Sequence, residues 1–244
     1  MSVIRRFAIK ARNVLRYGAY ILDYLEFKKS HDNRFGLSIL TGKACLNDKT
    51  AKTGFDRHYI YHVAWAARVL AETKPSRHAD ISSSLYFSSI VSAFIPVDFY
   101  DYRPAQLDLS GLISQHADLN NLPFADSSLA SLSCMHTVEH VGLGRYGDPI
   151  DPRGDLKAMS ELSRVLAHGG NLLFVVPVGK PKIIFNAHRI YSYDQIIAGF
   201  SNLRLKRFSL IPENPQNGGL IVEASKELAD RQNYGCGCFW ITKD

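Results

Sequence analysis

The stretch that decides the fold runs from residue 116 to residue 170. It opens with HADLNNLPFADSSL (residues 116–129) and continues with ASLSCMHTVEH (residues 130–140), an apolar run that ends in polar residues. Further on, RVLAHGG (residues 164–170) indicates the end of a helix, and NLLFVVP (residues 171–177) indicates a buried strand. A strand, a loop, a helix and a second strand in this order are typical of a mostly parallel α/β sheet.

The same alternation extends to both sides of this stretch. We expect helices from Asp56 to near Pro75 and over 85–94. We expect strands over residues 79–81, 95–101, 112–118, 130–135, 172–176, 203–210 and 235–242. The loop and short helix of residues 212–234 leave room for the last two strands to close the sheet as an antiparallel hairpin. The sequence therefore predicts a doubly wound, mostly parallel, seven-stranded sheet in one domain of residues 56–244.

The composition sets limits on the class of protein. A chain of 244 residues with 46% hydrophobic residues can bury a sizeable core. No apolar run approaches the roughly 18–20 residues of a membrane span. Four cysteines in a chain of this length do not form a disulfide framework, so we expect reduced thiols in a cytoplasmic protein.

The positive charge gathers at the start of the chain. Residues 1–29 carry seven Lys and Arg against two acidic residues, while the whole chain has a net charge of +6. The rest of the chain is thus nearly neutral, and we expect no binding of nucleic acid. We interpret residues 1–55 as a basic amphipathic helix followed by a polar connecting segment, without the cleavage site of a secretory signal. The helix packs on the domain, lies on an anionic membrane face or binds a partner; the sequence leaves these alternatives open.

The strand, loop and helix of residues 116–170 resemble the central part of class I S-adenosylmethionine (SAM) methyltransferases. The resemblance implies a Rossmann-like fold and SAM as the cofactor. In such open sheets, ligands bind outside the carboxyl ends of the strands, where the strand order reverses. The residues that these ends would present to SAM are Asp80, Ser82, Ser84, Asp101, Asp118 and Leu119. Carboxylates accept protons from ribose hydroxyls and the adenine amino group, and a backbone N–H meets a ring nitrogen. Asp98 is a second candidate for the ribose acid.

The first turn departs from the family pattern. Methyltransferases usually place glycines after the acid of this turn, so that the backbone can approach the cofactor. Here the turn is DISSS (residues 80–84), with no glycine. Its hydroxyls can donate to the cofactor carboxylate beside a helix start, or they mark a site that no longer accepts SAM.

Methyl transfer to a hydroxyl needs a base that removes the acceptor proton, and a histidine is suited to this near neutral pH. The first candidate by position is His188, which follows the fifth strand in a loop expected to face the acceptor. His136 and His140 come next, with Glu139 as partner, and His62 is a more distant candidate. The alternative for residues 136–140 is a structural acid–histidine pair. Polar residues expected on the acceptor side are Arg145, Tyr146, Asn186, Arg189 and Tyr191. A capping box at Ser192 and Gln195 predicts the next helix.

Residues 142–155 form a long polar loop with four glycines, which we expect over the pocket. Asp148, Asp151 and Asp155 offer oxygen ligands for a divalent cation, but capping of turns and of the next helix is the favoured interpretation. Cys236 and Cys238 lack the four-ligand pattern of zinc sites. We therefore expect no metal.

A second resemblance covers almost the whole chain. Residues 56–62, 79–87, 97–104 and 186–192, together with YGCGCFW (residues 234–240), look like an uncharacterised family with a methyltransferase-like core and serines in the first turn. That family is associated with bacterial surface-polysaccharide genes, which implies a glycan or activated sugar as acceptor. The expected function is SAM-dependent O-methylation; the alternative is a non-catalytic methyltransferase-like binding or scaffold protein at the membrane surface.

Overall fold

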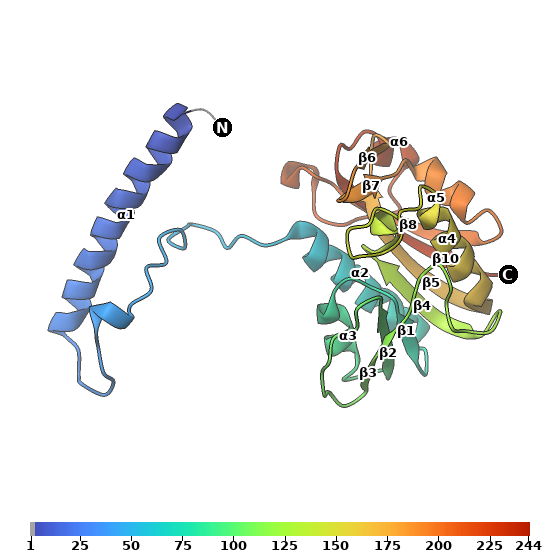
Figure 1. The fold of residues 1–244 in the computed structure, drawn as a ribbon, viewed down its shortest axis with the longest axis horizontal. Coiled ribbons are helices and arrows are strands. Elements are labelled where there is room, and N and C mark those ends of the chain that lie inside the picture. Colours follow the sequence, from blue (N-terminus) through green and yellow to red (C-terminus); the bar gives the residue numbers. More distant parts are fainter. Residues whose placement is uncertain (1–2) are drawn as a thin grey trace. The chain divides into compact units, whose positions relative to one another are not determined.

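The computed structural model of the chain describes residues 3–244, with side chains from Lys10 onward. The chain divides into two compact units, one ending at Phe55 and the other comprising Asp56–Asp244 (Figure 1). We call them the N-terminal and the C-terminal unit.

The N-terminal unit consists of one long helix and a segment folded back on it. Helix α1 spans Val3–Lys29, and the 3-10 turn η1 spans Ile39–Thr41. Lys49 pairs with Asp23 of the helix at 2.6 Å, which holds the returning segment. None of the side chains of residues 10–55 is buried. Among the residues that the structure describes, no helix is long and apolar enough to cross a membrane.

The C-terminal unit is built on an eight-stranded sheet of order β3-β2-β1-β4-β5-β10-β8-β9. Its strands are β1 (His78–Asp80), β2 (Val97–Asp101), β3 (Leu112–His116), β4 (Leu129–Met135), β5 (Leu166–Val178), β8 (Arg204–Ile211), β9 (Ile221–Val222) and β10 (Gly235–Thr242). The first five strands are parallel, and β10 lies antiparallel between β5 and β8. The chain crosses from β3 to β4 over β1, so the strand order reverses between β1 and β4.

Helices cover both faces of this sheet (Figure 1). On one face, α2 (Arg57–Thr73) and α3 (Leu85–Val91) pack with Trp65 and Phe87 in the core. On the other face lie α4 (Gly154–Val165), α5 (Tyr193–Gly199) and α6 (Lys226–Asp230). Apolar residues on both faces of β4 and β5 leave these strands buried on both sides, as in other parallel sheets.

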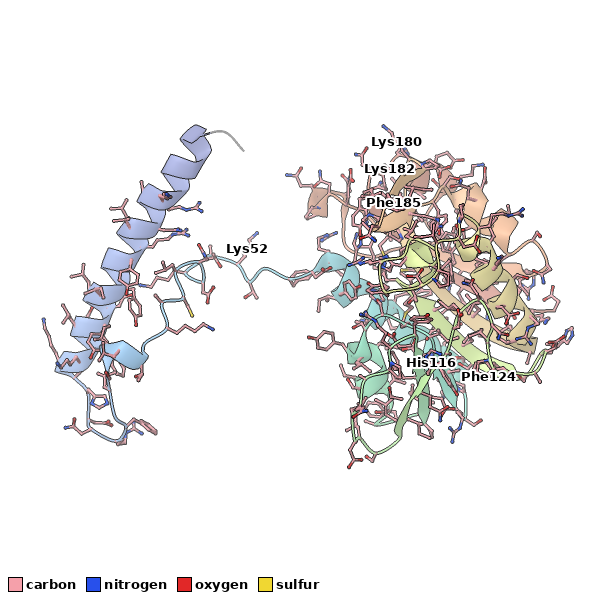
Figure 2. All side chains as sticks on the ribbon, viewed as in Figure 1. Lys52, His116, Phe124, Lys180, Lys182 and Phe185 are labelled. Atoms are coloured by element: carbon pink, nitrogen blue, oxygen red, sulfur yellow. The ribbon has the colours of Figure 1, made fainter. Side chains whose placement is uncertain are left out.

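Smaller elements lie between the main ones. They are the 3-10 turns η2 (Val138–His140) and η3 (Pro215–Asn217), and the strands β6 (Lys182–Ile184) and β7 (His188–Ile190). The last two form an antiparallel hairpin outside the main sheet. Figure 2 labels Lys182 and the exposed Phe185 on this hairpin.

Local sequence explains where the helices begin and end. The Asp56 side chain accepts the Tyr59 N–H at 3.1 Å and caps α2. Lys74 ends that helix in the left-handed conformation, directly before Pro75. The capping box expected at Ser192 and Gln195 is present at the start of α5.

The predicted fold class is confirmed, and several details differ. The sheet has eight strands because the two-residue β9 joins its edge, and so short a pairing leaves no pattern in the sequence. The β6–β7 hairpin was not predicted. Strand β5 starts at Leu166, six residues before the predicted start, because Leu166 already pairs with Leu129 ahead of a register shift.

Candidate cofactor and acceptor site

A pocket opens at the carboxyl ends of β1 to β4. Its wall is made by the turn after β1, the ends of β2 and β3, and the segment after β4. The lining residues are Ile81, Ser82, Ser83, Tyr100, Asp101, Tyr102, Arg103, Ala117, Asp118, Leu119, Asn120, Thr137, His140, Val141, Tyr146, Asp148 and Pro149. The pocket lies where the strand order reverses, which is where open α/β sheets bind their ligands.

Four of the six residues expected to contact a cofactor line this pocket: Ser82, Asp101, Asp118 and Leu119. Asp80 and Ser84 do not line it. Asp80 is fully buried and accepts hydroxyl protons from three serines, namely Ser82, Ser88 and Ser133. Burial raises the pKa of the Asp80 carboxyl, against the effect of those hydrogen bonds. The Ser84 hydroxyl accepts from the Tyr86 N–H and caps α3.

The first turn adopts its conformation without glycine. No residue from Ile81 to Ser84 has a positive φ, so the backbone does not require glycine there. The Ser82 hydroxyl accepts the Met135 N–H at 3.1 Å and thereby joins the ends of β1 and β4. Ser83 lies 3.3 Å from the Tyr59 hydroxyl of α2. Serine therefore adds hydrogen bonds within the protein at these positions.

The carboxylates after β2 and β3 face the pocket from ordered turns. Asp101 accepts the Arg103 N–H at 2.8 Å, and Asp118 accepts the Asn120 N–H at 2.9 Å. The Asn120 side-chain oxygen is buried and has no hydrogen-bond partner. We did not expect Asn120 at the site. An Asx turn starting at Asp118 was its only signal in the sequence.

Asp98, the second candidate for the ribose acid, forms an ion pair with Arg77 at 2.6 Å. It is not among the residues that line the pocket. Asp101, at the end of the same strand, does line the pocket.

Cationic and aromatic side chains gather at the pocket: Arg103 and Tyr146 line it, and Arg145 contacts Tyr146 without lining it. Tyr146 contacts the guanidinium groups of Arg103 and Arg145, at 4.5 and 5.1 Å from its ring centroid. Its ring meets that of His140 edge-on at 5.7 Å. The contact between Arg103 and Tyr146 joins the loop after β2 to the loop of residues 142–155. That long loop therefore lies over the pocket, as we expected.

Arg189 and Tyr191 were expected to orient the acceptor, but both are buried away from this pocket. Arg189 donates to the Val141 carbonyl at 2.6 Å and lies 3.5 Å from the Asp155 carboxylate. The Tyr191 hydroxyl donates to Asp155 at 3.1 Å. Their role is to hold the end of the long loop. Asn186 is exposed with φ 57°, and its amide donates to the Leu143 carbonyl at 3.4 Å.

The acidic residues of the long loop have partners within the protein. Asp148 accepts from the backbone N–H groups of Gly142 and Tyr146, at 2.7 and 3.2 Å. Asp151 pairs with Lys157 at 2.7 Å. Asp155 does not cap α4, contrary to expectation: the cap position is Arg153, which makes no side-chain capping bond.

His140 is the one candidate base on the pocket wall. Its Nδ1 lies 2.5 Å from the Ala187 carbonyl oxygen. Because a carbonyl only accepts, we assign the proton to Nδ1, which leaves a lone pair on Nε2. Arg145 donates to the same carbonyl at 3.2 Å. This contact fixes the orientation of the ring, and in the neutral form of His140 it leaves Nε2 able to accept a proton.

His188 lies behind His140, with the two ring centroids 6.5 Å apart. It does not line the pocket, and its Nε2 is buried without a hydrogen-bond partner. Burial lowers the pKa of His188.

A second group of side chains, which we call the histidine cluster, lies between α2, η2 and β10. It comprises His58, His62, His136, Glu139 and Cys236. His136 Nδ1 is 2.9 Å from Glu139 Oε1, and His136 Nε2 is 3.5 Å from Cys236 Sγ. All members except the half-buried His58 are buried. The expected acid–histidine pair therefore exists, within the cluster.

Burial changes the acid–base behaviour of the cluster. It lowers the pKa of His62 to about 3 and that of His58 to about 4, so both rings are neutral. For His136, burial lowers the pKa, but the Cys236 sulfur and the Glu139 carboxylate outweigh it and hold the pKa above its usual range. His136 also has φ 54°, a left-handed conformation that is strained for this residue.

Comparisons with known proteins agree with this architecture. The model of a family described as "Caenorhabditis protein of unknown function, DUF268" matches residues 116–216. No curated protein matches the chain.

Three solved structures are similar to the chain, each at 12% identity. The cyclase SpnF has a TM-score of 0.54 and covers 74% of this chain and 81% of its own. A protein named as a sarcosine dimethylglycine methyltransferase, from Galdieria sulphuraria, has a TM-score of 0.54, covering 75% and 84%. Geranyl diphosphate methyltransferase, solved with GPP and sinefungin, has a TM-score of 0.51, covering 74% and 78%. The C-terminal unit therefore has the Rossmann-like fold of class I methyltransferases.

Proposed function

We propose that the protein is a SAM-dependent methyltransferase that methylates a hydroxyl of a glycan or activated sugar. The observation that carries the proposal is the single pocket that brings Asp101, Asp118 and His140 together at the reversal of strand order. SAM, when bound, supplies an already activated methyl group. The protein then has to bind the cofactor, orient the acceptor and take up a proton.

The residues of the pocket fit the chemistry of SAM. Asp101 would accept protons from the ribose hydroxyls, and Asp118 would lie beside the adenine. The buried Asn120 oxygen lacks a donor, and the adenine amino group is a donor of the right kind. Ile81, Leu119 and Val141 add apolar wall to the same pocket. An unpaired acceptor beside two carboxylates supports a ligand rich in N–H and O–H groups.

His140 is the base that the geometry favours. We expected His188 first from the sequence, because it follows the fifth strand. His140 lines the pocket and has its Nδ1 proton held by the Ala187 carbonyl, whereas His188 lies one ring further back. In this proposal His140 Nε2 takes the acceptor proton, and His188 supports its ring from behind.

The acceptor class rests on the pocket mouth. Arg103, which lines the pocket, and Arg145 each place a guanidinium group against the Tyr146 ring. Guanidinium groups bind phosphate in a bidentate manner, and an aromatic ring packs against the apolar face of a sugar. An activated sugar, which carries both parts, suits this mouth. The resemblance to a family associated with surface polysaccharides supports the same class.

The test is methyl transfer from methyl-labelled SAM to a panel of sugar nucleotides. The proposal predicts label in at least one sugar product, and less label when Arg103→Ala replaces the wild type. SAM binding without transfer to any sugar or polysaccharide acceptor would favour the alternative, a non-catalytic binding protein.

A further inference from the structure

Three side chains with metal-binding atoms meet in the histidine cluster. His58 comes from the first turn of α2, His136 directly follows β4, and Cys236 comes from the start of β10. Their ligand atoms all lie within 4.8 Å of one another. We propose that they form a binding site for a divalent transition metal of the zinc class. This site stands independently of the proposed methyl transfer.

The contact between His136 and Cys236 has the spacing expected of two ligands bound to one ion. Zinc binds imidazole nitrogen at roughly 2.0–2.1 Å and thiolate sulfur at roughly 2.3 Å, and tetrahedral angles then put N and S about 3.6 Å apart. His136 Nε2 and Cys236 Sγ are 3.5 Å apart. An ion between these two atoms would need no movement of the buried strands. The adjustment falls on His58, which is half-buried at a helix start.

Glu139 orients the central ligand. Its Oε1 accepts from His136 Nδ1 at 2.9 Å, so Nε2 is the ring nitrogen that faces Cys236. Metal-bound histidines almost always donate their other ring N–H to a carboxylate or carbonyl in this way. Glu139 is buried, and its second oxygen has no hydrogen-bond partner. A buried carboxylate with a free oxygen is costly next to apolar core, and a nearby cation offsets that cost.

The donor set selects the class of ion. Two imidazoles and one thiolate suit zinc and other first-row transition metals, whereas magnesium and calcium prefer oxygen. Three protein ligands leave a fourth position for water or a substrate atom. The ion displaces the proton shared by Cys236 and His136, which passes to solvent, and the sulfur binds as thiolate.

The site would join segments that are distant in the sequence. It links α2, the end of β4 and the edge of β10, and Glu139 Oε1 also lies 3.9 Å from His140 Nε2. The ion would thus fix the carboxylate that stands between His136 and the pocket wall. The positions of both histidine rings would then depend on the metal.

The experiment is a metal titration of the full chain after treatment with a chelator. Every protein carries Cys45→Ser, because Cys45 is an exposed thiol that can bind metal on its own. Zn²⁺ is titrated against a coloured competing chelator, and Co²⁺ is added separately to record the near-ultraviolet band of cobalt–thiolate bonding. The variants are Cys236→Ser, His58→Gln and Glu139→Gln. The matched control is Cys238→Ser, a fully buried cysteine two residues along the same strand.

We expect one Zn²⁺ per chain and a cobalt–thiolate band in the parent and in Cys238→Ser. Glu139→Gln should weaken binding by roughly 10–100-fold, as for other partners of metal-bound histidines. Cys236→Ser and His58→Gln should weaken it more, and Cys236→Ser should abolish the band. His58→Gln keeps the test decisive if Cys236→Ser does not fold, since His58 is half-buried. Absence of stoichiometric binding in the parent, or binding that persists in His58→Gln, would overturn the proposal.

Discussion

The pocket and the histidine cluster lie at the same edge of the sheet and are built in opposite ways. In the pocket, Asp101 and Asp118 each accept one backbone N–H from their own turn, and Asn120 keeps a buried acceptor without a partner. In the cluster, His136 contacts Glu139 and Cys236 inside the protein. The pocket offers hydrogen bonds to a ligand, whereas most groups of the cluster contact one another and the second Glu139 oxygen has no hydrogen-bond partner. Adjacent residues, Glu139 and His140, connect the two.

The largest effect should appear where the two regions meet. His140→Ala removes the base that we place on the pocket wall, and turnover should fall by roughly 10²–10⁴. SAM affinity should stay nearly unchanged, because His140 is assigned to the acceptor proton. The measurement is single-turnover methyl transfer, with a SAM titration of the same variant.

Two further histidine variants sharpen that result. His188→Ala should reduce turnover less than His140→Ala, since His188 does not line the pocket. His168→Ala is the matched control, because this exposed residue contacts the Asp244 carbonyl far along the chain. If His188→Ala proves the more damaging change, the original expectation from the sequence is correct and our assignment of the base is wrong.

The pocket carboxylates should affect binding alone. Asp101→Ala and Asp118→Ala each remove hydrogen bonds to the ribose or adenine, at a cost of about 1–3 kcal/mol, or about 5- to 150-fold in Kd. Asp108→Ala, an exposed carboxylate after β2, should leave the Kd unchanged. Isothermal titration with SAM measures all three. Equal Kd values for SAM in the wild type and all variants would show that this pocket is not the SAM site. A parallel loss of Zn²⁺ binding in Asp101→Ala or Asp118→Ala would show that the pocket and the histidine cluster are not separate.

The smallest effect on the two regions should come from the N-terminal unit. We propose that α1 attaches the protein to anionic membrane, because Val14, Leu15 and Leu22 are exposed on a basic helix. Deletion of residues 1–29 should leave SAM and Zn²⁺ binding intact and abolish sedimentation with anionic vesicles. Wild-type binding to vesicles should weaken as salt rises. An unfolded deletion variant, or a wild type that ignores vesicles, would favour a helix that packs on protein.

The sequence predicted the features that follow from local pattern. The bounds of β10 and the capping box of α5 were correct, because strand alternation and caps are local. Asp101 and Asp118 were placed on the pocket because strand ends share one edge. The sequence could not distinguish Asp80 from these two residues. Asp80 is buried with hydrogen bonds from Ser88 and Ser133, and these hydroxyls approach it only in the folded chain.

The residues that do not line the pocket show what local sequence pattern cannot predict. In the sequence Arg189 and Tyr191 look like polar loop residues, but in the structure both are buried and contact the Asp155 carboxylate. We expected no metal because Cys236 and Cys238 lack nearby ligands in the sequence. The metal site that we propose depends on His136, which lies 100 residues from Cys236 in the sequence, and no spacing rule covers such a separation.

The central claim is that the pocket with serines in its first turn binds SAM. Isothermal titration of the wild type with SAM and S-adenosylhomocysteine tests it most directly, with Asp118→Ala as the matched variant. The account predicts one site per chain for both ligands, and a Kd about 5- to 150-fold weaker in Asp118→Ala. No heat and no thermal shift with millimolar SAM, from protein that is folded, would contradict it.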